Sequence, residues 1–160
     1  LAVKYIFSAY FCIKVNEVIE MKIDIVYTTK SKYIKCVADE MARWVKTYAQ
    51  DLKHYHSDHA ADLLVIGFDD TLFKDKQLLE FIQSLSRQNV KNLALINCFF
   101  INNKRLMKVI HLCQNQQLPL MREQYTFKMS FDQRKEINPL IIDNARLYIE
   151  DMVNVIRDYY

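Results

Sequence analysis

Short, continuously apolar stretches alternate along this chain with longer stretches in which apolar residues recur at helical spacing. The strongest apolar stretches are 22–27, 62–68 and 92–99. They are followed by segments with the periodicity of amphipathic helices, at 33–48, 75–87 and 102–116. Strands that are apolar on both faces are typical of a parallel sheet covered by helices on both sides. The alternation therefore predicts an α/β fold.

Two weaker stretches complete the predicted sheet. Residues 51–56 indicate a weak strand at a sheet edge, and 118–129 indicate a last strand, with Pro119 suited to its start or to an edge. Asn138 and Pro139 are typical of a helix cap and the first helical residue. This succession predicts a three-layer, doubly wound, five-stranded parallel sheet of order 2-1-3-4-5. Its ligand crevice would lie at the carboxyl ends of the first and third strands.

The alternating pattern starts at Met21, so residues 21–160 are predicted to form one domain and residues 1–20 an N-terminal extension. The apolar part of this extension, residues 1–13, is shorter than the roughly 20 residues of a membrane-spanning helix, and no membrane association is predicted. The 4 cysteines form no CxxC pair, which favours reduced thiols and a cytoplasmic location.

Charge and glycine content exclude several classes of site. The net charge is only +3, and no long run of like charges occurs, which argues against nucleic-acid binding. Gly67 is the single glycine of the chain. The GxGxxG and Walker motifs each need more than one glycine and are therefore excluded. Wherever this backbone adopts a left-handed conformation, another residue type must replace glycine.

The loop after the first predicted strand carries hydroxyl and lysine side chains directly before a helix. The free N–H groups and the dipole of a helix start favour a bound anion. Hydroxyls and a lysine would add hydrogen bonds and positive charge for a phosphate. The simpler interpretation, in which a hydroxyl only caps the helix and the lysines are solvated, stays open. The candidate residues are Thr28, Thr29, Lys30, Ser31, Lys32 and Tyr33.

With its strand, turn and helix aligned, the stretch VYTTKSKYIKCVADEMA resembles the opening of a short-chain flavodoxin. Thr29 and Ser31 fall on the family's phosphate-binding hydroxyl positions, whereas Lys32 replaces the family's glycine. The resemblance continues through DLLVIGF, KNLALINCFFINNKRLMK and YIEDMVNVIRDYY, and so covers residues 21–160. A side chain at the glycine position is expected to strain the turn, so that Lys32→Gly would tighten phosphate binding.

This resemblance implies a protein that binds FMN and transfers electrons to a redox partner, rather than an enzyme with a substrate of its own. The loop at 28–33 would hold the phosphate, and the loops after the third and fourth strands would hold the flavin ring. Acidic side chains beside the ring would lower its reduction potential. The implied ring-site residues are Phe68, Asp69, Asp70, Thr71, Leu72, Cys98, Phe99 and Phe100, with Phe73 beside them.

Other interpretations remain. A flavodoxin-like module that has lost FMN would use the same crevice for another anion or for a protein partner without redox chemistry. A receiver domain would need carboxylates at the end of the first strand, where IVYTTK has none. A zinc site could form from His54, His56, Asp58 and His59, although exposed polar residues at a sheet edge explain the same pattern.

Overall fold

The computed structural model describes residues 20–28, 32–70, 76–129 and 136–159. It contains five strands, four α-helices and one short 3₁₀-helix within these ranges. In chain order they are β1 (Ile23–Tyr27), α2 (Lys32–Trp44), β2 (Ala49–Asp51), η1 (Leu52–His54), β3 (Leu63–Asp69), α3 (Lys76–Ser84), β4 (Leu93–Phe99), α4 (Lys104–Asn115), β5 (Tyr125–Lys128) and α5 (Pro139–Tyr159).

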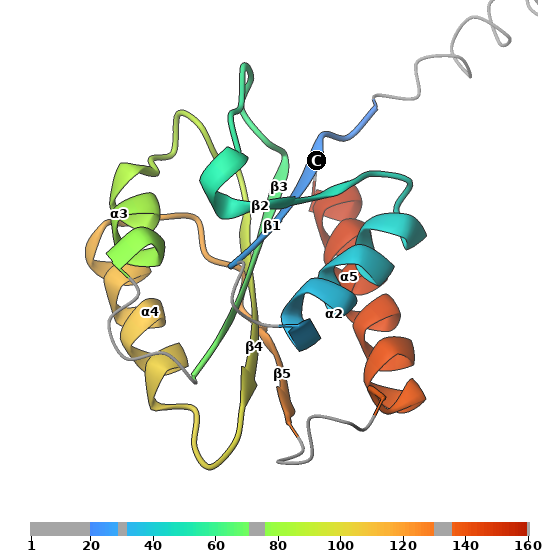
Figure 1. Ribbon diagram of the computed structural model, residues 1–160. Coiled ribbons are helices and arrows are strands. Elements are labelled where there is room, and N and C mark those ends of the chain that lie inside the picture. The colour runs from blue at the N-terminus through green and yellow to red at the C-terminus, as the bar shows by residue number, and fades with distance from the viewer. Residues whose placement is uncertain (1–19, 29–31, 71–75, 130–135, 160) are drawn as a thin grey trace, which may run out of the picture.

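The strands form one sheet of order β2-β1-β3-β4-β5, and every adjacent pair is parallel. Helices α2 and α5 cover one face of the sheet, and α3 and α4 cover the other (Figure 1). Burial of β3 and β4 between these layers is nearly complete, which explains their continuously apolar sequences. The predicted three-layer, doubly wound fold is therefore confirmed. None of the helices within the described ranges is long and apolar enough to cross a membrane.

The second strand differs from the prediction. It covers Ala49–Asp51 rather than 51–56, and a 3₁₀-helix follows at Leu52–His54. The carboxylate of Asp51 accepts a hydrogen bond from the backbone N–H of Lys53 at 2.9 Å. This local bond satisfies a backbone donor within the turn and ends the extended conformation. The strand lies at the sheet edge, as expected.

The last strand is also shorter than predicted, covering Tyr125–Lys128 rather than 118–129. Around Pro119 the chain makes only an isolated parallel bridge, between Leu120 and Leu93. The carbonyl of Pro119 accepts from the N–H of Leu93 at 2.9 Å, so the residue uses its acceptor while lacking a donor. The segment therefore pairs with β4 at two places, first at the Leu120 bridge and then along β5.

Two helices end with left-handed residues that are not glycine. Lys46 follows α2 with φ 60°, and Gln117 follows α4 with φ 55°. The N–H of Thr47 donates to the carbonyl of Ala42 at 2.8 Å, which is the long hydrogen bond of a Schellman motif. The N–H of Leu118 makes the same bond to Cys113 at 3.0 Å. These ends therefore carry the backbone strain that a glycine would avoid.

We expect Lys46→Gly and Gln117→Gly each to raise the free energy of unfolding by about 0.5–1 kcal/mol, because glycine adopts this conformation without a Cβ penalty. Urea denaturation measures the change. The exposed helical residue Lys108 provides the control, since Lys108→Gly should lower stability by about 1 kcal/mol. Destabilisation by glycine at 46 or 117 would contradict this account of the helix ends.

Gly67 lies inside β3 and does not end it, because the strand continues to Asp69. It pairs with Tyr27 on one side and Ile96 on the other. A Cβ atom at this position would come within 2.8 Å of Cγ2 of Ile34 in α2. The missing side chain therefore allows the first turn of α2 to pack directly on the central strand.

Gly67→Ala is expected to lower the free energy of unfolding by about 1–3 kcal/mol, because the methyl group overpacks the contact between α2 and β3. Ile34→Ala removes the clashing methyl, so Gly67→Ala in that background should cost less than half as much. A double-mutant cycle by chemical denaturation measures the coupling. Strict additivity of the two substitutions would show that Ile34 does not limit the space at Gly67.

Candidate functional site

The parallel sheet brings the carboxyl ends of β1, β3 and β4 together at one edge, the lower edge in Figure 1. Thr28 follows β1 directly and is 5% exposed, and its N–H donates to the carbonyl of Gly67 at 3.0 Å. This bond continues the ladder one residue beyond β1. The predicted phosphate-binding residues Thr29, Lys30 and Ser31 lie outside the described residues.

Helix α2 begins at Lys32, which is exposed. Among the described non-glycine residues, only Lys46 and Gln117 have positive φ, so Lys32 adopts an ordinary right-handed conformation. The expected strain at this family glycine position is therefore wrong, because the helix has already begun there. Lys32 instead adds a positive charge to the positive end of the helix dipole.

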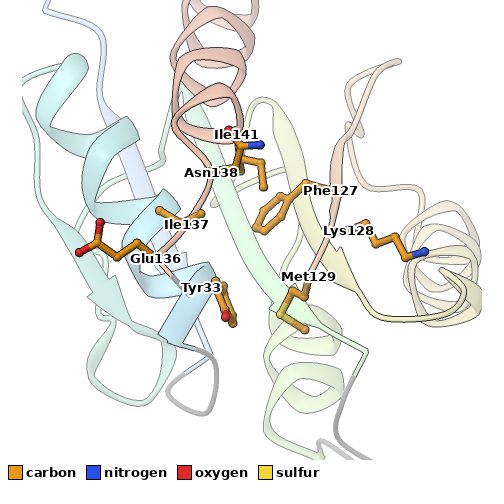
Figure 2. A pocket seen from close by; sticks show the side chains of 8 residues that line it. All are labelled: Tyr33, Phe127, Lys128, Met129, Glu136, Ile137, Asn138 and Ile141. Atoms are coloured by element: carbon orange, nitrogen blue, oxygen red, sulfur yellow. The ribbon is translucent and has the colours of Figure 1, made fainter. Parts of the chain in front are cut away.

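Tyr33 lies in the first turn of α2 and is partly buried. It lines a cavity of about 370 Å³ between the start of α2, the end of β5 and the approach to α5, and Figure 2 shows its arrangement. The Tyr33 hydroxyl is buried without a hydrogen-bond partner in the described part of the chain. The other lining residues are Phe127, Lys128, Met129, Glu136, Ile137, Asn138 and Ile141.

Asp70, which directly follows β3, and Asn97, which lies within β4, form a polar pair. Nδ2 of Asn97 donates to Oδ1 of Asp70 at 3.2 Å and to the carbonyl of Phe68 at 3.4 Å. The other oxygens, Oδ2 of Asp70 and Oδ1 of Asn97, are buried without partners in the described ranges. Two buried acceptors that lack donors mark a place where a ligand with N–H or O–H groups would gain hydrogen bonds.

Burial raises the pKa of the Asp70 carboxyl above its ordinary value. The hydrogen bond from Asn97 and the positive charge of Arg105 oppose this shift, and the neighbouring Asp69 adds to it. Asp69 itself is 3% exposed and lies in β3. Of the two predicted acidic residues, Asp69 is thus buried and Asp70 is partly buried.

Asn97 was not among the predicted site residues. It is 0% exposed within β4, in which the adjacent residues Ile96 and Cys98 are also buried and apolar. A polar residue inside a continuously apolar strand is unusual, since its amide must find partners in the core. That interruption of the stretch 92–99 was the available signal in the sequence.

The predicted ring-site residues divide into core residues and partly buried ones. Phe68 is 1% exposed and Cys98 0%, so both side chains pack in the core and offer no surface to a ring. Phe99 ends β4 and Phe100 follows it, and both residues are partly buried. Thr71, Leu72 and Phe73 lie outside the described residues, as does the loop segment 71–75 to which they belong.

The described histidines and cysteines do not form a metal site or a reactive thiol. The described residues contain no group of three or more His, Cys, Asp or Glu side chains arranged to hold a metal ion. His54 lies in η1 and is exposed, as are His56 and His59. The described cysteines, Cys36, Cys98 and Cys113, are free thiols, and burial raises the pKa of Cys113 to about 11. Such a thiol remains protonated near neutral pH and is a poor nucleophile.

Comparisons with known proteins give the fold but no close relative. No family model matches the sequence, and no curated protein matches it. A flavodoxin from the domain Archaea superposes with a TM-score of 0.60 at 11% identity, covering 86% of this chain and 99% of that chain. Flavodoxin 1 from Bacillus cereus superposes with a TM-score of 0.62 at 12% identity, covering 83% and 97%.

A longer protein shows the same similarity. The rubredoxin:oxygen oxidoreductase from Desulfovibrio gigas superposes with a TM-score of 0.65 at 12% identity, covering 86% of this chain and 36% of that chain. Together these structures show that the chain has a flavodoxin-like fold. At such low identity the similarity does not carry a ligand or an activity with it.

The raised pKa of Asp70 predicts a pH dependence of stability. The folded state binds the proton more tightly than the unfolded chain. Asp70 therefore disfavours folding once it ionises, as pH rises from the ordinary aspartate pKa of 3.8 through the raised pKa. We therefore expect Asp70→Asn to gain stability relative to the wild type as pH rises through this window. Urea denaturation across the acidic to neutral range measures the difference. The exposed Asp151→Asn is the control, and an equal pH dependence in both variants would contradict the prediction.

Proposed function

We propose that the carboxyl edge of the sheet binds FMN and that the protein serves as an electron carrier. The observation that carries this proposal is the pair of buried oxygens, Oδ1 of Asn97 and Oδ2 of Asp70, which lack donors in the described chain. FMN offers donors of the required kind in its ribityl hydroxyls and its ring N–H. The flavodoxin-like fold supports FMN over other ligands with N–H and O–H donors.

The start of α2 fits the phosphate end of the same ligand. Its first-turn amides and its dipole attract an anion, and Lys32 adds a full positive charge. No acidic residue lies in this first turn to repel a phosphate. Thr29 and Ser31 would add hydroxyl donors from the loop that precedes the helix.

Phe99 and Phe100 are partly buried aromatic residues that follow Asn97 and Cys98 in sequence. Partly exposed aromatic side chains can stack on a flat heterocycle. FMN, once bound, accepts and donates one or two electrons. The chain's own contribution is to hold the ligand and to place the buried Asp69 and the partly buried Asp70 near its ring. Negative charge there would disfavour an anionic reduced flavin and lower its reduction potential.

FMN fluorescence tests the proposal directly. Addition of the purified protein to FMN should quench the fluorescence in a saturable manner and shift the flavin absorbance. Absence of both effects at excess protein would exclude an FMN carrier and leave the alternative, a flavodoxin-like module that binds another anion or a protein. The cytoplasmic location and the identity of the redox partner stay predictions.

Lys32→Gln should weaken FMN binding by about three- to tenfold, since it removes one charge-assisted contact to the phosphate. Ser31→Ala should weaken it similarly through the lost hydroxyl. The effect at Lys32 should shrink as ionic strength rises. Arg122→Gln is the matched control, because Arg122 is exposed and precedes β5 at the opposite edge of the sheet. Equal loss in the Arg122 variant would mean that only overall charge attracts FMN.

A further inference from the structure

Exposed lysines from three elements surround the carboxyl edge of the sheet. Lys32 begins α2, Lys104 and Lys108 lie one turn apart near the start of α4, and Lys128 ends β5. Figure 2 shows Lys128 extending away from the cavity beside it. None of these four side chains forms an ion pair with another described residue.

Five basic residues elsewhere in the described chain form ion pairs. At the amino edge, Lys91 pairs with Asp62 at 2.7 Å and Lys22 lies 3.7 Å from Asp24. On the α2–α5 side, Lys35 pairs with Asp39 at 2.7 Å. Arg43 and Arg146 share Glu40, each at 2.8 Å. The lysines of the carboxyl edge thus keep their charge available to an external partner.

Two of these charges, Lys32 and Lys104, also oppose the dipoles of their own helices. No acidic residue lies in the first turn of α2, α3, α4 or α5, although carboxylates are favourable there. Lys32, Lys76 and Lys104 stand at three of these helix starts instead. A cation at this end of a helix is unfavourable by roughly 0.3–1 kcal/mol. Repetition of this arrangement builds a positive potential along one edge of the molecule without stabilising the fold.

Two apolar side chains lie among these charges. Ile101, in the segment between β4 and α4, is 79% exposed, and Met107 in α4 is 47% exposed. Methionine and other apolar side chains within a polar rim are typical of the centre of a protein interface. Nucleic-acid surfaces would instead favour a continuous basic stripe.

We infer that the carboxyl edge is a docking surface for an acidic protein, whose carboxylates would meet Lys32, Lys104, Lys108 and Lys128 around an apolar contact with Ile101 and Met107. Complementary charge would orient the partner and accelerate its association. The surface surrounds the proposed FMN site, so its use for electron transfer rests on the proposed function. Binding of the acidic partner does not rest on the proposed function, because the residues that form the surface are side chains of the protein itself and need no bound FMN.

An acidic model peptide tests the docking surface. The probe is a synthetic peptide in which glutamates flank two leucines, added to isotope-labelled protein and followed by backbone amide shifts. We expect shifts at Lys32, Ile101, Lys104, Met107 and Lys128, with binding that weakens as salt is added. Shifts confined to the amino edge, no shifts at all, or stronger binding of a DNA duplex of equal charge would overturn the inference.

Charge reversal identifies the responsible residues. Lys104→Glu and Lys108→Glu should each weaken peptide binding by about three- to tenfold, whereas Arg122→Glu at the opposite edge should change it less than about twofold. Equal effects of all three substitutions would also overturn the inference, because net charge alone would then explain binding. The titration is run with and without FMN. Peptide binding without FMN binding would refute only the electron carrier, and FMN binding without peptide binding would refute only the docking surface.

Discussion

The contact between Ile34 of α2 and Gly67 of β3 determines the geometry of the carboxyl edge. Because Gly67 has no side chain, the first turn of α2 packs against the central strand, where a Cβ would lie 2.8 Å from Cγ2 of Ile34. This packing places Lys32 and the free amides of α2 next to the ends of β1 and β3. The single glycine of the chain therefore serves helix packing and does not lie in a phosphate-binding turn. Elsewhere it tolerates left-handed lysine and glutamine.

The same edge combines two features that reduce stability and favour a ligand. Asp70 and Asn97 bury oxygens that have no donor in the described chain, and the lysines at the helix starts oppose the helix dipoles. Strain and unsatisfied groups of this kind concentrate at functional sites, because the ligand supplies the missing partner. The two buried acceptor oxygens would bind a flavin within the crevice. The exposed lysines around the crevice would bind an acidic protein.

Most of the fold could be predicted because β3 and β4 are apolar on both faces and the helices have strong 3.6-residue periodicity. The limits of β2 could not, since they depend on a hydrogen bond of the Asp51 side chain to its own turn. The role of Gly67 could not either, because it arises from a contact with Ile34, 33 positions away in the sequence. At the site, the start of α2 was predicted to within one residue, yet the expected strain at Lys32 was wrong. Asn97 was not predicted, because its apolar neighbours in β4 indicate a core strand and its partner Asp70 lies 27 positions away in the sequence.

Nuclear magnetic resonance of the isotope-labelled protein during addition of FMN tests the central claim most directly. Bound FMN should shift the backbone amides of Lys32, Tyr33 and Ile34 at the start of α2. It should also shift the side-chain amide of Asn97, which borders the two acceptor oxygens. Amides around Arg122 should stay unchanged. Absence of shifts at both α2 and Asn97, or shifts found only at the opposite edge of the sheet, would contradict an FMN site at the carboxyl ends of β1, β3 and β4.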